Sequence, residues 1–167
     1  MHAFNKNIKT CVIGRDGRES GVLFSKFLSK GLRSVGVNVI DLGMVPTPLV
    51  YFATHHLETG TGIVITGSHN PPEYNGLKLM LGGETLWGET IQKIKQDLPD
   101  SESRRKKLRN KTLGWYKKLD LSDIYETKII RSVNIERKLK IGIDAGNGVA
   151  GPLAKKIFKN LGCIVFD

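Results

Sequence analysis

The chain has 167 residues, 40% of them hydrophobic, which is enough to bury a core in one domain, or in one domain and part of another. Its formal net charge of +10 favours an anionic partner but does not distinguish a nucleic acid, a membrane surface or a phosphorylated metabolite. No secretory signal opens the sequence, and no stretch approaches the roughly 18 apolar residues of a membrane helix. Cys11 and Cys163 lie in short apolar runs as small buried hydrophobes, so we expect a soluble, cytoplasmic protein without a membrane partner.

Strands and helices alternate through the first hundred residues. Apolar runs predict strands over residues 10–14, 37–42, 62–66 and 76–81. Apolar residues at helical spacing predict helices over 19–35, 47–57 and 89–98, the first through Val22, Leu23, Phe27, Leu28, Leu32 and Val35. This alternation indicates an α/β fold, a three-layer α/β/α domain with a mainly parallel mixed sheet.

The composition then changes to charge between residues 99 and 113, where Lys and Arg gather at Arg104, Arg105, Lys106, Lys107, Arg109 and Lys111. We interpret this segment as a solvated surface, because no aromatic residues are interleaved with the charges, and we expect no nucleic-acid partner. A helix is predicted over 121–133, followed by a new strand, Gly-rich turn, helix and strand. The sequence therefore predicts one domain over 1–136 and the beginning of a second, similar domain over 137–167.

The turn in the second unit matches a dinucleotide-binding pattern. The glycines from Gly146 to Gly151 fit G-x-G-x-x-G, follow a predicted strand and open a predicted helix, and Asp167 ends the next strand. Asp144 stands directly before the turn, where it would crowd a pyrophosphate. The same pattern also arises wherever a strand turns tightly into a helix, so nucleotide binding stays open as an alternative.

The stretch "ITGSHNPPEYNGLKL", residues 65–79, ends a buried strand on small, polar and rigid residues. Residues just past the carboxyl ends of parallel strands line the ligand crevice, so Ser68 is expected to face a cleft. Gly67 would leave space for an approaching substrate, and Pro71 and Pro72 would order the loop before a ligand arrives. His69 could donate a hydrogen bond, and Lys78 could return to the same place on the next strand, which suits phosphoryl transfer. Glycine, proline, asparagine and serine are also common in ordinary turns, so spacing alone leaves both interpretations open.

Two further groups of polar residues receive a structural interpretation. Arg15, Asp16 and Arg18 lie at a strand-to-helix turn, where an ion pair that stabilises the turn is favoured over contact with an anionic substrate. His55 and His56 lie on a predicted helix without metal-ligand partners at a suitable spacing, and we assign them no role.

Several of these motifs together resemble the α-D-phosphohexomutases, and within them the phosphomannomutase/phosphoglucomutase group. "TGSHNPPEYNGLKL" is similar to the phosphoserine loop of that family. The stretches "VIGRDGRESG", "DLGMVPTPLVYFA", "GETL" and "IDAGNGVAG" resemble other family segments in the same order. The family uses the last of these as a structural turn, which counts against the dinucleotide interpretation.

The resemblance implies an isomerase that interconverts hexose 1-phosphate and hexose 6-phosphate, with mannose or glucose as the sugar. Ser68 would hold the phosphoryl group and bind Mg²⁺ through it, His69 and Lys78 would assist transfer, and a hexose bisphosphate would activate the enzyme. The family's aspartate-rich metal loop, sugar-discriminating loop and C-terminal phosphate-binding domain have no counterpart in these residues. We therefore expect a fragment or a truncated relative that is inactive alone, and a non-catalytic binding module remains an alternative.

Overall fold

The structure is a computed structural model that describes residues 9–96 and 112–166. The basic segment at 104–111, the predicted helix end at Leu98 and the acid Asp167 lie outside this range. The strands are β1 (Thr10–Arg15), β2 (Asn38–Met44), β3 (Thr61–Ile65), β4 (Leu77–Leu81), β5 (Glu84–Thr85), β6 (Tyr116–Lys118), β7 (Lys140–Gly142) and β8 (Ile164–Phe166). The helices are α1 (Glu19–Ser34), α2 (Thr47–His56), α3 (Gly88–Gln96), α5 (Ser122–Ser132) and α6 (Gly151–Asn160).

The main sheet is mixed and mostly parallel, with the order β5-β4-β3-β1-β2-β6. β1 pairs in parallel with β2 and β3, β6 pairs in parallel with β2, and β4 and β5 are antiparallel to their neighbours. The carboxyl ends of β1, β2 and β3 therefore meet at one edge of the sheet. Because β4 is antiparallel, it starts at that same edge, with Leu77 opposite Ile65. The predicted fold class is confirmed.

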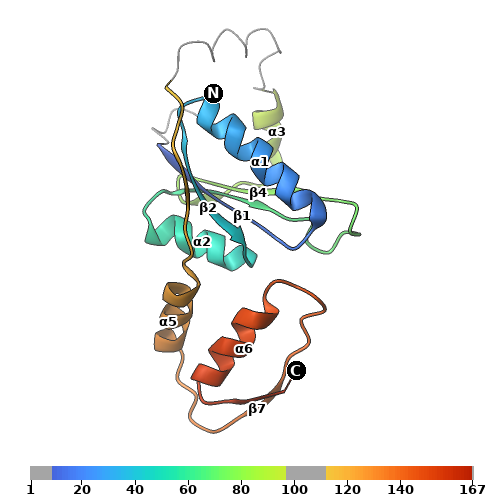
Figure 1. Cartoon of the computed structure of the whole chain (residues 1–167), viewed down its shortest axis with the longest axis vertical. Helices are drawn as coiled ribbons and strands as arrows, with labels where there is room; N and C mark the ends of the chain where they lie inside the picture. The colour runs from blue at the N-terminus through green and yellow to red at the C-terminus, as the bar shows by residue number, and fades with distance from the viewer. Residues whose placement is uncertain (1–8, 97–111, 167) are drawn as a thin grey trace.

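Helices cover both faces of this sheet (Figure 1). On one face, Leu49 and Val50 of α2 belong to a buried cluster that includes Val12 and Val64 of the strands. On the other face, Leu28 and Leu32 of α1 pack against a cluster that the strands form from Cys11, Ile13 and Val39. Burying each large aliphatic side chain contributes about 1.5–3 kcal/mol, so these two clusters supply much of the stability that holds the carboxyl edge in place.

The buried face of α1 differs from the simplest expectation. Gly21, Ser25 and Ser29 are buried at intervals of four residues, whereas Val22 and Phe27 are 58% and 61% exposed. Residues four apart share one face of a helix, and here that face carries the small side chains. The spacing of apolar residues therefore predicted the helix correctly but did not identify all of the side chains that it buries.

The edge strand β6 was not expected from the sequence. All three of its residues are exposed, so no buried side of the strand gives an alternating pattern. Hydrogen bonds to distant residues instead fix the two residues that precede β6. The amide of Trp115 donates to Asn38 Oδ1 at 3.1 Å, and Nε of Arg33 donates to the Gly114 carbonyl at 2.8 Å.

α5 connects the main sheet to a second, two-stranded parallel sheet formed by β7 and β8. Leu121, just before α5, is buried in the α2-side cluster. On α6, the Lys156 ammonium lies 2.7 Å from Asp123 Oδ1 and 2.6 Å from Glu126 Oε2, both on α5. Figure 1 shows α5 and α6 side by side below the main sheet. The domain division at residue 136 stays a prediction. Within the described ranges, no helix has the length and apolar character needed to cross a bilayer.

Candidate active site

The loop between β3 and β4 lies at the carboxyl edge of the sheet and consists of two successive turns. The amide of Asn70 donates to the Gly67 carbonyl at 3.0 Å, which closes the first turn. The amide of Tyr74 donates to the Pro71 carbonyl at 3.0 Å, which closes the second. Pro72 occupies the first central position of this second turn, where the fixed φ of proline is favourable. The chain therefore projects from the sheet and returns along β4.

Ser68 has an unusual backbone conformation at the tip of the first turn. Its φ is +53°, in the left-handed region, which costs a residue other than glycine about 1 kcal/mol. The Ser68 amide donates to Thr66 Oγ1 at 2.9 Å, and this contact helps to hold the conformation. The side chain is exposed, and no described residue forms a hydrogen bond with its hydroxyl. Ser68 Oγ is therefore presented outward with both lone pairs available.

The Arg18 side chain holds the loop by its backbone. Its guanidinium donates to four loop carbonyls, from Nη1 to Pro71 (2.5 Å) and Tyr74 (2.9 Å), and from Nη2 to Ser68 (3.1 Å) and Asn70 (2.7 Å). These carbonyls belong to both turns, so one planar group fixes the two turns relative to each other. The rigid fork of donors on arginine suits this task, whereas a lysine ammonium presents its donors from a single point.

The space beside Gly67 serves a different purpose from the one expected. A Cβ atom at this position would lie 2.4 Å from Cζ of Arg18, well inside van der Waals contact. The expectation that Gly67 leaves room for a substrate is therefore wrong on this side of the residue, because the guanidinium of Arg18 fills that room. Glycine is required here so that the arginine can lie flat against the loop.

Asp16 connects the β1–α1 turn to the same loop. Its carboxylate accepts the Arg18 amide at 3.0 Å, Arg18 Nε at 3.2 Å and the Gly67 amide at 3.3 Å. The predicted ion pair between Asp16 and Arg18 is therefore present. Burial alone would raise the pKa of Asp16, but hydrogen bonds from the Arg18 amide, the Thr66 hydroxyl and the Gly67 amide, with the Arg18 charge, lower it overall. The loop is thus held by a carboxylate that folding keeps ionised.

The lowered pKa of Asp16 predicts a loss of stability in acid. A carboxyl group whose pKa is lowered by folding stabilises the protein above its unfolded pKa of about 4, and this contribution is lost as the pH falls through the folded value. We expect the difference in unfolding free energy between the wild type and Asp16→Asn to shrink steadily from pH 6 to pH 2. Urea unfolding at a series of pH values measures it, and a constant difference would contradict the assignment.

The other two predicted site residues lie near Ser68 without contacting it. His69 is the next residue of the first turn and is exposed. Lys78 is the second residue of β4, lies opposite Val64 in the strand pairing and is also exposed. No hydrogen bond or ion pair joins the side chains of Ser68, His69 and Lys78 among the described residues. The structure therefore brings the three residues to the carboxyl edge of the sheet, each with an exposed side chain.

The described residues do not form a complete metal site. Mg²⁺ prefers six oxygen ligands in octahedral geometry, and a phosphorylated Ser68 could supply one of them. Within residues 9–96 and 112–166, no group of three His, Cys, Asp or Glu side chains could hold a metal ion. The predicted Mg²⁺ therefore does not fit these residues alone, and the roles assigned to them below involve no metal.

The Gly-rich segment between β7 and α6 forms a tight turn. Gly146 and Asn147 have φ values of +50° and +61°, and the Gly146 amide donates to Asp144 Oδ1 at 2.9 Å. That amide is one of the donors that a bound pyrophosphate would need. Because the Asp144 carboxylate already accepts from this amide, the contact favours a structural turn over a pyrophosphate site.

The sequence reasoning did not find the role of Arg18. It placed Arg18 correctly in an ion pair with Asp16, but the loop carbonyls that the guanidinium binds lie 50 to 56 positions further along the chain. The available signal was the occurrence of "GRDGR" together with a glycine before Ser68, since an arginine side chain that binds several loop carbonyls needs space beside the loop.

Comparisons with known proteins show which family the chain resembles. The sequence model of the family described as phosphoglucomutase/phosphomannomutase, alpha/beta/alpha domain I, matches residues 1–105. A phosphoglucomutase of Neisseria gonorrhoeae is 44% identical over 160 residues, covering 96% of this chain and 34% of the relative. A phosphomannomutase/phosphoglucomutase of Pseudomonas putida is 41% identical over 155 residues, covering 92% and 32%.

Solved structures show the same similarity in three dimensions. The crystal structure of a phosphoglucomutase/phosphomannomutase family protein from Burkholderia thailandensis matches 99% of this chain and 36% of its own, with a TM-score of 0.85 and 38% identity. The fold is thus that of the α/β/α domains of phosphohexomutases. The chain belongs to the phosphoglucomutase/phosphomannomutase family. It spans about a third of the length of the relatives it matches.

Proposed function

We propose that Ser68 carries a phosphoryl group and exchanges it with hexose phosphates, in the interconversion of hexose 1-phosphate and hexose 6-phosphate with mannose or glucose as the sugar. One observation carries the proposal: a serine in a left-handed conformation, with a free hydroxyl, stands on a loop whose backbone one arginine holds in place. Phosphoryl transfer depends chiefly on positioning and electrostatic stabilisation, and a loop fixed before binding provides the first.

The reaction consists of two transfers in opposite directions. In the first, a free hydroxyl of the hexose phosphate attacks the phosphoryl group, a sugar O–P bond forms and the Ser68 Oγ–P bond breaks. The sugar hydroxyl loses its proton to a base, and the leaving Ser68 Oγ takes up a proton. The hexose bisphosphate then reorients, so that its other phosphate lies next to Ser68. In the second, Ser68 Oγ attacks the phosphoryl group at the other end of the sugar, the Oγ–P bond forms as that sugar O–P bond breaks, the serine proton leaves to a base, and the sugar oxygen takes up a proton. A hexose bisphosphate added to the unphosphorylated protein would enter at this second step, which is why it would activate the enzyme.

His69 and Lys78 are placed to assist these transfers. The exposed imidazole of His69, adjacent to Ser68, can donate a hydrogen bond to a phosphoryl oxygen. The Lys78 ammonium is a flexible point charge that can approach the phosphoryl group when a substrate enters, and positive charge there stabilises the transition state.

Incubation of the chain with glucose 1,6-bisphosphate, followed by peptide mass spectrometry, tests the proposal. We expect one stoichiometric phosphoryl group, located on Ser68. The alternative of a non-catalytic binding module predicts no covalent phosphoryl group, and a phosphoryl group on another residue would also overturn the assignment.

Lys78→Ala separates a functional lysine from a structural one. The side chain is exposed and has no partner among the described residues, so we expect the thermal midpoint to stay nearly unchanged. Losing its charge from the transition state should slow phosphoryl uptake on the order of 10²-fold. Lys118→Ala is the matched control, because it removes an exposed lysine from β6, four strands away from β4 in the sheet order. If Lys78→Ala lowers the thermal midpoint and leaves the rate intact, the lysine is structural.

A second expected result concerns complete turnover by the 167-residue polypeptide. A mutase must hold both phosphates of a bisphosphate while the sugar reorients, and the two groups proposed above, His69 and Lys78, both serve the phosphoryl group being transferred. We therefore expect phosphoryl uptake without conversion of glucose 1-phosphate to glucose 6-phosphate. A coupled assay with Mg²⁺ and glucose 1,6-bisphosphate measures this, and sustained turnover by the polypeptide alone would refute it.

A further inference from the structure

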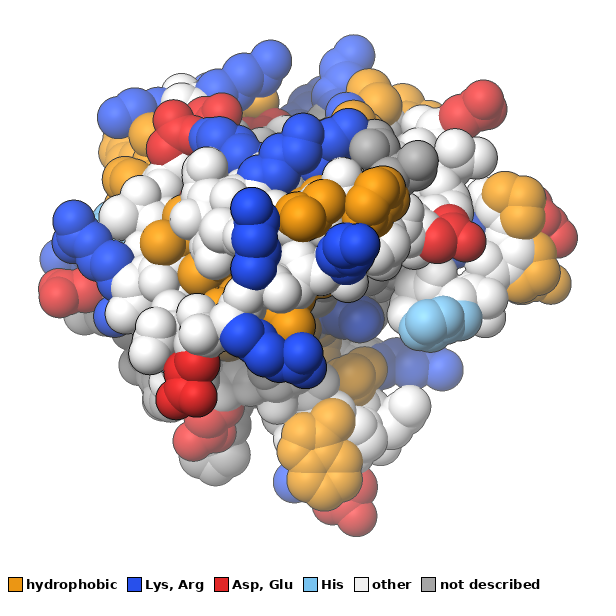
Figure 2. All heavy atoms as spheres, turned by 90° about the horizontal axis from the view of Figure 1, so that it is seen from below, with side chains coloured by type: hydrophobic (Ala, Val, Ile, Leu, Met, Phe, Trp, Pro, Cys, Tyr) orange, Lys and Arg blue, Asp and Glu red, His pale blue; other side chains and the backbone are white. Residues whose placement is uncertain are grey.

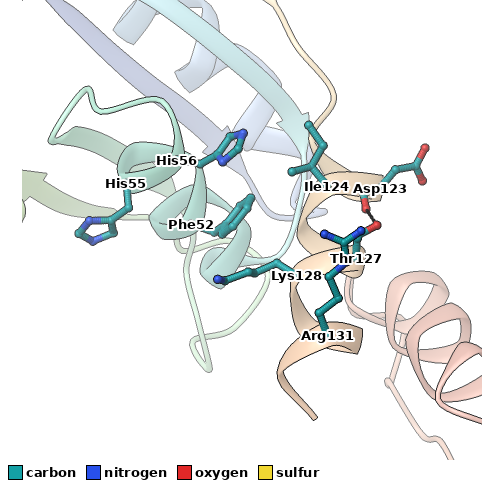
Figure 3. A pocket seen from close by; sticks show the side chains of 8 residues that line it. All are labelled: Phe52, His55, His56, Asp123, Ile124, Thr127, Lys128 and Arg131. Carbon is teal, nitrogen blue, oxygen red and sulfur yellow. Dashed lines mark hydrogen bonds between the residues drawn. The ribbon is translucent and has the colours of Figure 1, made fainter. Parts of the chain in front are cut away.

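A pocket lies between α2 and α5, outside the Ser68 loop (Figure 3). The α2 wall consists of Phe52, His55 and His56. The α5 wall consists of Asp123, Ile124, Thr127, Lys128 and Arg131, which lie on one face of the helix. The two histidines, to which the sequence assigned no role, occupy the last turn of α2.

The charges in this pocket are unbalanced. Lys128 and Arg131 are exposed and form no ion pair or hydrogen bond through their side chains with any other described residue. The one carboxylate of the lining, that of Asp123, already lies 2.7 Å from the Lys156 ammonium. The two cations are therefore free to bind an anion.

The surrounding surface adds to this positive charge. Between residues 121 and 166 the chain has eight Lys and Arg residues against four Asp and Glu residues. Figure 2 shows the molecule from below, with many Lys and Arg side chains and fewer Asp and Glu side chains on this face. Such a field concentrates anions near the pocket and speeds their association.

The other lining groups are apolar or aromatic. The rings of Phe52 and His56 stack with their centroids 5.2 Å apart and an interplanar angle of 14°. Ile124 faces the same pocket and is 46% exposed, and Figure 3 shows Lys128 extending from α5 toward Phe52. A flat ring can cover the exposed parts of Phe52 and Ile124 while a phosphate reaches the cations.

We propose that this pocket binds a small phosphate ester with a flat, apolar ring, the chemistry of a nucleoside monophosphate. Lys128 and Arg131 bind the phosphate, and Phe52, His56 and Ile124 contact the ring. A hexose phosphate supplies the same anion but surrounds it with hydroxyl groups, for which this apolar wall offers few partners. The site is separate from Ser68, so the proposal does not depend on the proposed function.

Titration calorimetry of the full chain tests the site, with adenosine monophosphate as the probe. Adenosine tests the need for the phosphate, and glucose 6-phosphate tests the need for the ring. We expect adenosine monophosphate to bind with one-to-one stoichiometry and each of the other two to bind at least about tenfold more weakly, because each lacks one of the two contacts. No saturable binding, or equal binding of all three, overturns the proposal.

Variants locate the binding. Lys128→Ala/Arg131→Ala should weaken adenosine monophosphate binding on the order of 10- to 100-fold, as two charge-assisted contacts are lost. Lys26→Ala/Lys30→Ala removes the same charge from exposed positions on α1 and should change the affinity by less than about twofold. Ile124→Glu, at a half-exposed position, should also prevent binding by placing a carboxylate in the pocket. Equal weakening by both double variants, or unchanged binding in Ile124→Glu, would show that the ligand binds elsewhere.

Discussion

Replacement of Ser68 by alanine is expected to abolish phosphoryl uptake from a hexose bisphosphate and to leave the fold intact. The Ser68 hydroxyl has no hydrogen-bond partner among the described residues, so its removal breaks no contact. The backbone contacts of Ser68 remain available, because its amide donates to Thr66 and its carbonyl accepts from Arg18. Alanine keeps the left-handed backbone at a cost similar to that of serine. The change therefore removes the nucleophile alone.

Intact-mass measurement after incubation with glucose 1,6-bisphosphate checks this result, and thermal unfolding checks the fold. Ser132→Ala is the matched control, because Ser132 is an exposed serine at the end of α5 and far from the loop in sequence. We expect full uptake in that variant and none above background in Ser68→Ala. If Ser68→Ala takes up as much phosphoryl as the wild type, another residue is the acceptor.

Replacement of Arg18 by methionine is expected to slow phosphoryl uptake by about 10²-fold while Ser68 itself remains. Methionine has a similar length but cannot donate to the four loop carbonyls or pair with Asp16. The two turns then lose their common support, and the serine samples positions away from the productive one. A displacement of about 1 Å is enough to cost a reaction of this kind about 10²-fold.

Two further variants distinguish the geometry of Arg18 from its charge and from general stability. Arg18→Lys keeps the charge but not the fork, and we expect it to restore little of the rate. Arg33→Met is the matched control, because Arg33 binds the Gly114 carbonyl at the other end of α1, about 20 Å away at 1.5 Å per residue. It should leave uptake unchanged. Hydrogen exchange at the amides of Ser68 and Asn70 should accelerate in Arg18→Met alone, and unchanged exchange would contradict a positioning role.

The sequence was sufficient for the parts of this protein that depend on neighbouring residues. β1, β2 and β3 are short apolar runs, and α1, α2 and α5 have helical spacing, so local periodicity predicted them within a few residues. The mainly parallel orientation of the strands followed from the alternation of these elements. The Ser68 loop stands within a dozen consecutive residues, but its spacing alone also fitted an ordinary turn, and the resemblance to the family's phosphoserine loop favoured the functional interpretation.

The tertiary structure alone decided which distant groups meet. The contacts of Arg18 with the loop join residues at least 50 positions apart, and no local pattern encodes that pairing. β6 forms because a neighbouring strand offers a free edge, although its own side chains are all exposed. The small residues of α1 face the sheet because close packing selects shape as well as hydrophobicity. The α2–α5 pocket likewise unites His55 and Arg131 only after the helices have packed, since burial and contact depend on the whole fold.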